Sequence, residues 1–485
     1  MRKPFVPDPQ QAHQVYFEAI SRIPRGSENE KAVSDYVVSI ARSLGLEARQ
    51  DALWNVVVKK PASPGYEDAP PVMLQAHLDM VCVKAPDSAH DFTRDPLRLF
   101  VDDEGHLTAD GTTLGADDGY GVAYMLSVMS EDFPHPPLEL VFTSQEENGC
   151  WGARALDMSD IQARRMIGLD VMESLQENVC CVSCFCSDLL VLKRNSRLEP
   201  VRGKGLKLHI DGIQPIREGA QVHPELFNAI KLTGRLLDDL MAEGYDLRLV
   251  SMRGGEAENY NPVSCETVLT TDSPLALSKA ATRLMEGYAA EIQDGRQSTH
   301  LVLSEEEEEV GNALTAEDTR SLVDALLLTP SNTQTIDQVT QEMTSVTCVG
   351  IVSLNEGVFT LTLSDRARSD SYRHAIERRV RAVARLTGCE LQAEERYAPW
   401  VYRPDSYMLR KTADLMQRFY GEKMTESICP GGLEACDFLP KVPEMDIVMF
   451  APIGDKCHST EEYLDLASFD RVYRFLKTLL GELRQ

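Results

Sequence analysis

Short runs of consecutive apolar residues, separated by segments long enough for helices, constrain the fold of this chain more than any other feature. In the first third of the sequence these runs are Trp54–Val58, Val72–Ala76, Leu138–Thr143 and Met166–Leu169. Continuous rather than alternating hydrophobicity indicates strands that are buried on both faces, as in a sheet covered by helices. One intervening segment, Gly121–Met129, is itself predicted to be helical. We therefore expect an α/β fold built on a helix-covered mixed sheet.

The segment before the first of these runs is predicted to form a helix from about residue 28 to residue 44. Ser27 and Glu30 have the spacing of a capping box, in which each side chain hydrogen-bonds to the backbone N–H of the other residue. Gly45 is the expected stop, because glycine readily adopts the left-handed conformation that ends many helices. The apolar face of this helix consists of Val33, Val37, Ala41 and Leu44.

From about residue 187 the hydrophobic pattern changes to alternation, as at Leu206, Leu208 and Ile210, which is typical of half-buried antiparallel strands. A helix over 226–243 and strands at 247–249 and 265–271 follow, and a similar order returns over 316–366 before a helix over 371–386 that ends at Gly388. We expect an α+β domain here, with an internal duplication as a hypothesis. The run Glu305–Glu309 is interpreted as a solvated turn or helix end, with a cation site as the alternative.

After about residue 397 the first pattern resumes, with a helix over 407–420, an apolar run at 445–450 and a closing helix over 468–480. A length of 485 residues exceeds what one hydrophobic core supports. We therefore predict a discontinuous catalytic domain, residues 1–186 and 397–485, interrupted by a lid or dimerisation domain, residues 187–396.

The composition limits the partners and the compartment of the protein. The chain has 49 Lys and Arg against 76 Asp and Glu, a net charge of -27, which opposes binding to nucleic acid or to an anionic membrane. No apolar run approaches the roughly 20 residues of a membrane span, and the first residues lack the apolar core of a signal peptide. We expect a cytoplasmic protein with no nucleic-acid and no membrane partner.

The 12 cysteines fit a reducing compartment, since they show no framework of a small disulfide-rich fold. Cys180, Cys181, Cys184 and Cys186 form a cluster that contains one C-x-x-C pair. No second pair lies at the spacing of a zinc finger. Buried, unreactive thiols are the preferred interpretation, and a zinc or redox site is the alternative.

Histidine and acidic side chains follow the buried runs at the points where strands are expected to end. In an open α/β sheet, ligands bind outside the carboxyl ends of the strands, so residues that are far apart in sequence converge there. Imidazoles and carboxylates serve both as metal ligands and as proton carriers. The edge is therefore predicted to hold a two-metal hydrolytic site made of His77, Asp79, Asp117, Glu146, Glu147, Asp170 and His458.

Spacing and chemistry suggest different roles within this set. His77 and Asp79 lie on the same face of one strand, so the carboxylate can orient the imidazole. Asp117 lies in a glycine-rich loop before a helix and can bridge two cations about 3.5–4 Å apart, with a helix N-cap as the alternative role. Of Glu146 and Glu147, one can bind metal while the other takes a proton from water.

Five segments resemble one known family over almost the entire chain. They are Val72–Val81 (VMLQAHLDMV), His90–Pro96 (HDFTRDP), Gly111–Gly121 (GTTLGADDGYG), Gln145–Glu147 (QEE) and Gly431–Cys436 (GGLEAC). These motifs are similar to those of the aminoacyl-histidine dipeptidases, cytosolic relatives of carnosinase. The resemblance implies a zinc-exopeptidase-like catalytic domain, a homodimer and two divalent cations, with zinc as the expected metal and manganese or cobalt as alternatives.

The resemblance also implies individual roles in the metal site. It places His77 and Asp170 on one ion, Glu147 and His458 on the other, and Asp117 between them. It implies that Asp79 orients His77 and that Glu146 acts as general base and acid. These roles agree with those suggested by the residues themselves.

The inserted domain departs from the family's pattern. Where the family has a Gly-Gly-His-Ser-Gly turn, this chain has Pro215–Gly219, with Arg217 in place of the histidine that stabilises the oxyanion. Arg217 is predicted to grip an additional anionic group of the substrate, with oxyanion stabilisation as the alternative. The arginine that holds the substrate carboxylate is matched to Arg366, with Arg368 as the alternative. The predicted substrate contacts are Arg217, Asn259, Arg366 and Glu434.

The predicted function is a dimetal hydrolase that cleaves dipeptides of the Xaa-His type, or related small amides, near their free carboxylate. Glu146 is expected to deprotonate a water that bridges the two metals. A hydrolase of N-acyl amino acids or other small peptides with the same site is one alternative. A metal-binding protein with little catalysis is an alternative of a different class.

Overall fold

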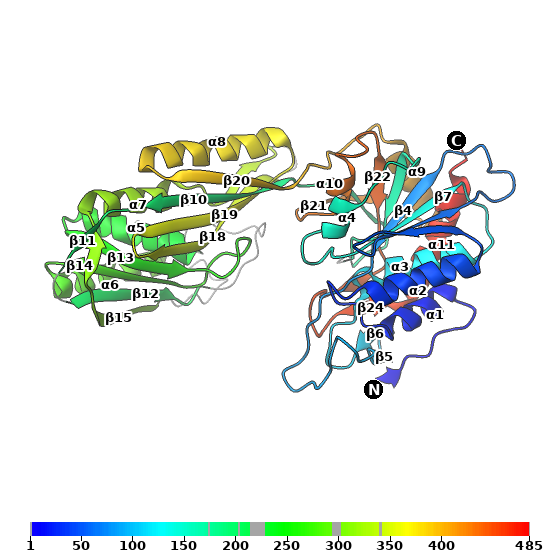
Figure 1. Ribbon diagram of the computed structural model, residues 1–485, viewed down its shortest axis with the longest axis horizontal. Helices are drawn as coiled ribbons and strands as arrows, with labels where there is room; N and C mark the ends of the chain where they lie inside the picture. The colour runs from blue at the N-terminus through cyan, green and yellow to red at the C-terminus, as the bar shows by residue number, and fades with distance from the viewer. Residues whose placement is uncertain are drawn as a thin grey trace. The chain divides into compact units, whose positions relative to one another are not determined.

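The chain folds into two compact units in this computed structural model, which describes residues 2–172, 175–201, 204–213, 228–292, 302–338 and 342–484. Unit 1 comprises Met1–Cys184, Trp400–Cys429 and Leu433–Gln485, and unit 2 comprises Phe185–Pro399 and Pro430–Gly432. Figure 1 shows the blue and red ends of the chain in unit 1, whereas the green and yellow middle of the chain forms unit 2.

The central sheet of unit 1 is mixed, and its four middle strands run parallel to one another. Their carboxyl ends therefore meet at one edge, while β3 pairs antiparallel with β7. In spatial order the strands are β2 (Glu47–Gln50), β3 (Val56–Lys60), β7 (Leu138–Thr143), β4 (Val72–His77), β8 (Arg165–Gly168), β22 (Asp446–Met449), β9 (Val179–Cys184) and β21 (Thr425–Cys429).

Helices cover both faces of this sheet. Every residue of β4 and β7 is buried, as the continuous apolar runs predict. Val72, Leu74 and Ala76 share one hydrophobic core with α1 (Ala12–Ser21), α2 (Lys31–Ser43), α3 (Ala116–Ser130), α9 (Tyr407–Phe419) and α11 (Leu466–Glu482). On the opposite face of β4, the Gln75 side-chain amide donates a hydrogen bond to Glu434, the residue before α10 (Ala435–Phe438). α10 packs against α4 (Trp151–Ala155) on this face.

A smaller sheet in unit 1 carries a hairpin close to the metal centre described below. Its strands are β1 (Lys3–Pro4), β5 (Leu99–Val101), β6 (His106–Ala109), β24 (Tyr463–Asp465) and β23 (Gly454–Asp455), in that spatial order. β23 and β24 pair antiparallel, so residues 456–462 form the loop of this hairpin.

The predicted helix over 28–44 is shorter in the structure, and the predicted capping box is wrong. α2 begins at Lys31, and its N-cap Glu30 makes no side-chain cap hydrogen bond. Ser27 Oγ donates to Asp79 Oδ2 at 2.8 Å, and the Glu30 carboxylate accepts from Gln145 N at 2.9 Å. Both side chains are engaged by loops at the sheet edge instead of by the helix. Gly45 follows the helix with φ +73°, as expected for a helix stop.

Unit 2 is an antiparallel sheet with four helices among its described residues. The strands in spatial order are β15 (Val302–Glu309), β12 (Lys204–Asp211), β14 (Cys265–Thr271), β13 (Leu247–Gly254), β18 (Met343–Asn355), β19 (Val358–Ala367), β10 (Ser187–Asn195) and β20 (Glu390–Tyr397), with β17 (Asn332–Ile336) beside β18. A separate pair is β11 (Leu198–Pro200) with β16 (Asn312–Leu314), and the helices are α5 (Ala229–Ala242), α6 (Pro274–Ile292), α7 (Ala316–Leu328) and α8 (Asp370–Thr387).

One prediction for this unit is wrong, and the internal duplication stays a hypothesis. Glu305–Glu309 is neither a turn nor a helix end, because it lies in β15 and pairs antiparallel with β12 through the backbone. The two segments considered as a duplication contribute to a single sheet, since β13 pairs with β18. The helix predicted over 371–386 is α8, which ends at Gly388 with φ +66°.

The clustered cysteines are buried, as the preferred interpretation predicts. Cys180, Cys181, Cys184 and Cys186 are all buried, and none forms a disulfide. Burial raises the pKa of Cys180 and of Cys186 to about 12, so both are protonated at neutral pH. No metal-ligand grouping within the described part of the chain includes a cysteine. Among the helices of the same residues, none combines the length and hydropathy needed to cross a membrane.

Candidate metal centre

Six potential ligands converge at the carboxyl edge of the parallel strands in unit 1. His77 ends β4, and Asp170 lies two residues beyond β8. Asp117 lies in the first turn of α3 with non-helical backbone angles, and the N-cap of this helix is Gly115. The alternative role of Asp117 as a helix N-cap is therefore wrong. The remaining ligands are Glu146 and Glu147, which follow β7, and His458, which lies in the β23–β24 loop.

The two oxygens of Asp117 face two different histidines. Asp117 Oδ1 lies 3.2 Å from His77 Nε2, and Asp117 Oδ2 lies 3.3 Å from His458 Nε2. Asp170 Oδ1 is 3.7 Å from the same nitrogen of His77, while Glu147 Oε2 is 3.1 Å from that of His458. Asp117 thus belongs to two groups of potential ligands. The first group is His77, Asp117 and Asp170, and the second is Asp117, Glu147 and His458. Within each group the ligand atoms lie within 4.8 Å of one another.

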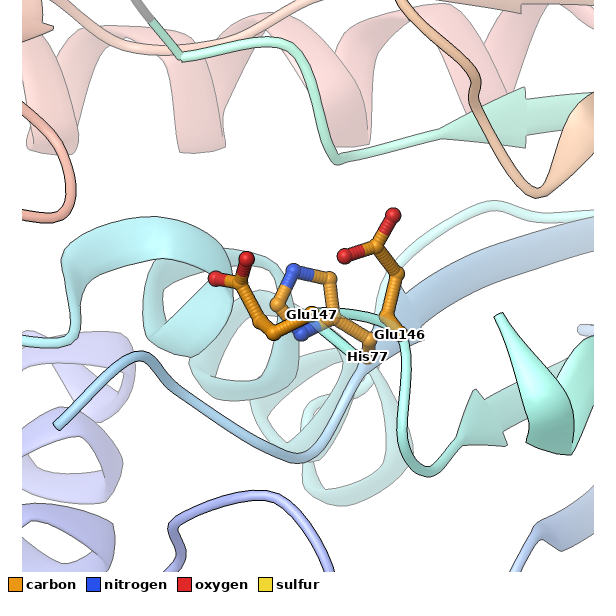
Figure 2. Close-up of side chains that lie close together, drawn as sticks. All are labelled: His77, Glu146 and Glu147. Atoms are coloured by element: carbon orange, nitrogen blue, oxygen red, sulfur yellow. The ribbon is translucent and has the colours of Figure 1, made fainter. Parts of the chain in front are cut away.

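Glu146 and Glu147 present their carboxylates on different sides of His77. Figure 2 shows the imidazole ring between the two carboxylates, which diverge from adjacent positions on the chain. The three side chains form a third group whose ligand atoms lie within 4.8 Å. Glu147 also contacts His458, whereas the Glu146 Oε1 atom accepts from the Cys150 thiol at 3.5 Å. The two adjacent acids therefore have different surroundings.

Asp79 connects the strand that carries His77 to the loop that carries the two glutamates. Its Oδ1 atom lies 3.3 Å from His77 Nδ1 and accepts from the Glu146 backbone N–H at 3.0 Å. Its Oδ2 atom accepts from the Glu147 N–H at 3.1 Å and from the Ser27 hydroxyl at 2.8 Å. Asp79 is fully buried, so one carboxylate contacts the imidazole and holds the backbone of the loop at the same time.

Several carboxyl groups lie close together in the centre, where burial removes them from water. Burial raises the pKa of Glu146 and of Asp170 well above the usual range, and it also raises that of Glu147. The carboxylates of Asp117 and Glu147 raise the pKa of His458 to about 11. The pKa of His77 is well above its ordinary value although burial opposes this, because Asp117 and Asp79 favour its protonated form. The centre therefore attracts cations.

The residues present fit two divalent cations. The groups contain four carboxylates, from Asp117, Glu146, Glu147 and Asp170, and two imidazoles. These carboxylates, with the buried Asp79 beside His77, supply negative charge that offsets the charge of two such cations. Imidazole nitrogen and carboxylate oxygen are also the donors found in catalytic zinc sites. The donor atoms, their negative charge and the position of Asp117 between the two histidines all suit a pair of metal ions.

Two of the predicted substrate contacts belong to unit 2, and a third falls outside the described residues. Arg366 is on β19 and donates from Nη1 to Pro430 O at 2.6 Å, and Asn259 lies between β13 and β14; both belong to unit 2. Arg217 is outside the described residues. Their roles stay predictions from the sequence.

Glu434, the fourth predicted contact, is buried against the strand ends of unit 1. It accepts from Gln75 Nε2 at 2.6 Å and from Thr143 Oγ1 at 2.5 Å. Burial raises the pKa of Glu434 to about 8. The side chain is only 1% exposed, so its contact with a substrate also stays a prediction.

Four buried charged residues that support the centre were missed by sequence reasoning. Asp118 accepts from His77 N at 3.1 Å. Glu462 accepts from the backbone of the loop before α3, Arg25 donates to the backbone after β4, and Glu30 accepts from Gln145 N. All four act on backbone groups, which leave no residue pattern in a sequence. Glu462 lies four residues after His458, and this proximity was the available hint.

Known proteins share both the sequence and the fold of this chain. The chain is 30% identical to the cytosol non-specific dipeptidase of Escherichia coli (strain K12) over 476 residues, which cover 96% of each protein. The crystal structure of aminoacylhistidine dipeptidase from Vibrio alginolyticus matches with a TM-score of 0.83 and 29% identity, covering 98% of this chain and 97% of that chain. Human carnosine dipeptidase 1 matches with a TM-score of 0.52 and 12% identity, covering 98% of this chain and 96% of that chain, which shows a likeness of fold alone.

These comparisons confirm the predicted fold class and the predicted resemblance to aminoacyl-histidine dipeptidases. Residues 73–482 match the family described as peptidase family M20/M25/M40. The match spans most of the chain, from the strand that carries His77 to the closing helix. The chain therefore belongs to peptidase family M20/M25/M40.

Proposed function

We propose that this protein is a metallo-dipeptidase that uses two divalent cations to cleave small peptides. The observation that carries the proposal is the placement of Asp117, whose two oxygens face His77 and His458 separately. A carboxylate shared in this way is what a pair of hydrolytic metal ions needs. The names of the two relatives with the highest identity given above, both dipeptidases, support the same activity.

His77 and Asp170 would hold one cation, Glu147 and His458 the other, and Asp117 would bridge them. Two such ions would polarise the scissile carbonyl and increase the acidity of the attacking water. We propose zinc as the metal, with manganese or cobalt as alternatives, because the donor set of imidazole and carboxylate accepts all three.

Glu146 is the proposed proton carrier. Its carboxylate belongs to the group around His77, whereas that of Glu147 belongs also to the group that contains Asp117 and His458. It takes the proton of the attacking water and returns it to the leaving amine, so that one side chain serves as base and then as acid. Asp79 holds the backbone amide of Glu146 and thereby sets where this carboxylate stands.

The proposed substrates are dipeptides, including those that end in histidine. One relative is named a non-specific dipeptidase and the other an aminoacylhistidine dipeptidase. Arg217, Asn259, Arg366 and Glu434 are proposed substrate contacts on sequence grounds, with Arg217 favouring an extra anionic group. Hydrolysis of N-acyl amino acids is the second candidate, because the same metal chemistry would cleave either amide.

A substrate panel on purified protein tests this proposal. The panel contains a dipeptide ending in histidine, a dipeptide of two small residues, and the N-acetylated form of each, assayed with zinc, manganese or cobalt. Hydrolysis of the free dipeptides supports a dipeptidase, whereas faster hydrolysis of the acetylated forms supports the second candidate. Stoichiometric metal binding without hydrolysis of any substrate would contradict both and favour the metal-binding protein with little catalysis.

Cellular location and assembly are further proposals. We infer a cytosolic enzyme, which agrees with the name of the Escherichia coli relative. We also infer a homodimer, on the resemblance to the aminoacyl-histidine dipeptidases. Light scattering on the purified protein would give a mass of twice 54.0 kDa if the dimer is correct.

A further inference from the structure

One buried carboxylate, that of Glu462, accepts hydrogen bonds from four successive backbone amides. Its Oε2 atom accepts from Leu114 N at 2.8 Å and Gly115 N at 3.0 Å, and its Oε1 atom accepts from Ala116 N at 2.8 Å and Asp117 N at 3.3 Å. These amides lead into α3, but Asp117 and Asp118 have non-helical backbone angles, so the segment is irregular here. Glu462 supplies hydrogen-bond acceptors for backbone donors in this irregular segment.

Glu462 belongs to the same hairpin loop as His458. β23 and β24 pair through Gly454 with Leu464 and Asp455 with Tyr463, so the loop begins and ends at fixed positions. β24 also pairs with β6, the strand that leads into the 114–117 loop. One part of the hairpin loop thus presents an imidazole to Asp117, while the end of the same loop grips the backbone of Asp117.

The other side of the 114–117 loop rests on Arg25. Arg25 is 2% exposed and donates from Nη1 to Leu78 O at 3.0 Å and Asp79 O at 2.8 Å. Its Nη2 atom donates to Gly115 O, and a Cβ added at Gly115 would lie 2.6 Å from this nitrogen. The loop that carries Asp117 is therefore held between a buried carboxylate and a buried guanidinium, with the end of the His77 strand on one side and the His458 hairpin on the other.

We propose that Glu462 is a positioning residue that sets Asp117 and His458 at the separation that one cation requires. This inference rests on the two-cation site of the proposed function. His458 has a φ of +63° and a side chain that is 44% exposed, so its own packing restrains it weakly. His77 and Asp170, in contrast, stand at the ends of paired strands that Glu462 does not touch. Loss of Glu462 therefore weakens the cation held by Asp117, Glu147 and His458 more than the cation held by His77, Asp117 and Asp170.

Cobalt titration of the metal-free protein tests this asymmetry. Glu462→Gln keeps one acceptor oxygen but turns the other into an amide donor that faces backbone donors. We expect the visible absorption of bound cobalt to show that affinity for the second equivalent falls by about 10–100-fold, the usual cost of losing a group that supports a ligand. Affinity for the first equivalent changes less, and excess cobalt restores hydrolysis.

Glu461→Gln is the matched control, because it makes the same chemical change at the neighbouring residue. The Glu461 side chain is 71% exposed and pairs with Lys456 at 2.7 Å. We expect this variant to bind both equivalents like the wild type. Equal weakening by both substitutions would mean that loop charge in general, and not the contact with the 114–117 loop, is responsible, and it would overturn the proposal.

Other outcomes also decide the matter. A folded Glu462→Gln protein that binds both equivalents with wild-type affinity refutes the proposal, even if its melting temperature is lower. If that variant does not fold, hydrogen exchange of the metal-free wild type replaces it, and rapid exchange of the amides at 114–117 refutes the proposed restraint. A wild-type protein that binds fewer than two cobalt ions would instead remove the two-cation site, and with it both proposals.

Discussion

Replacing Glu146 with glutamine separates proton transfer from metal binding. Glutamine has nearly the same shape but cannot take up a proton from water. Because Glu147 and Asp117 contact the two histidines directly, we expect Glu146→Gln to retain both cations. General acid–base catalysis contributes about 10²–10⁴-fold, equivalent to roughly 3–5 kcal/mol of transition-state stabilisation. Glu146 both takes and returns the proton, so we expect a loss in the upper half of that range.

The assay combines kcat at saturating dipeptide with metal analysis of the same sample. Glu28→Gln is the matched control, since Glu28 accepts from Asn148 at 3.3 Å beside the same loop but belongs to no metal-ligand group among the described residues. A kcat within about tenfold of wild type, with two metals bound, would contradict the proton-carrier role. Loss of one metal equivalent would show instead that Glu146 is a ligand, as its grouping with His77 and Glu147 also permits.

Three further perturbations test other parts of the structure. His458→Ala should lose one cation while circular dichroism stays unchanged, and two full metal equivalents in this variant would exclude His458 from the site. Gly152→Ala would place a Cβ 2.2 Å from Ser144 O, and we expect calorimetry to show a lower melting temperature, for a loss of about 1–3 kcal/mol; an unchanged melting temperature would argue against this packing. Burial raises the pKa of Glu434 from 4.5 to about 8, so the metal-free wild type loses stability as pH rises between these values, because only the unfolded chain ionises there. Glu434→Gln should show a smaller loss, since burial also raises the pKa of Glu462 and of Glu30 to about 7, and parallel melting curves of both proteins across that range would contradict the assignment.

The clustering of the candidate ligands was predictable, because side chains that follow buried parallel strands meet at one edge of the sheet. Continuous apolar runs marked β4 and β7 as buried strands, and His77, Glu146 and Glu147 followed those strands directly. The supports of the site were not predictable, because Glu462 and Arg25 bind backbone groups of loops that only the tertiary structure brings near. From the sequence alone, Glu462 cannot be distinguished from its neighbour Glu461 in the same hairpin loop.

The errors have the same origin. Ser27 and Glu30 have the spacing of a capping box. In the structure, however, Ser27 donates to Asp79 and Glu30 accepts from the Gln145 backbone amide. Acidic residues are depleted in strands, yet Glu305–Glu309 is held in β15 by backbone pairing with β12. Local propensity is therefore a weak guide wherever a neighbouring segment supplies a stronger partner.

Strand β22 lies between β8 and β9 in the central sheet, although β8 and β9 are consecutive strands in the chain. The sheet is incomplete until β22, from near the end of the chain, inserts between two strands that are synthesised much earlier. Pairing over such a sequence separation makes folding slow, because the entropy of closing a long loop is lost before the contacts form. During synthesis unit 2, most of which is the continuous stretch Phe185–Pro399, is complete before β22 leaves the ribosome. Until then the nascent chain holds an open gap between β8 and β9, with unpaired strand edges that need protection from aggregation.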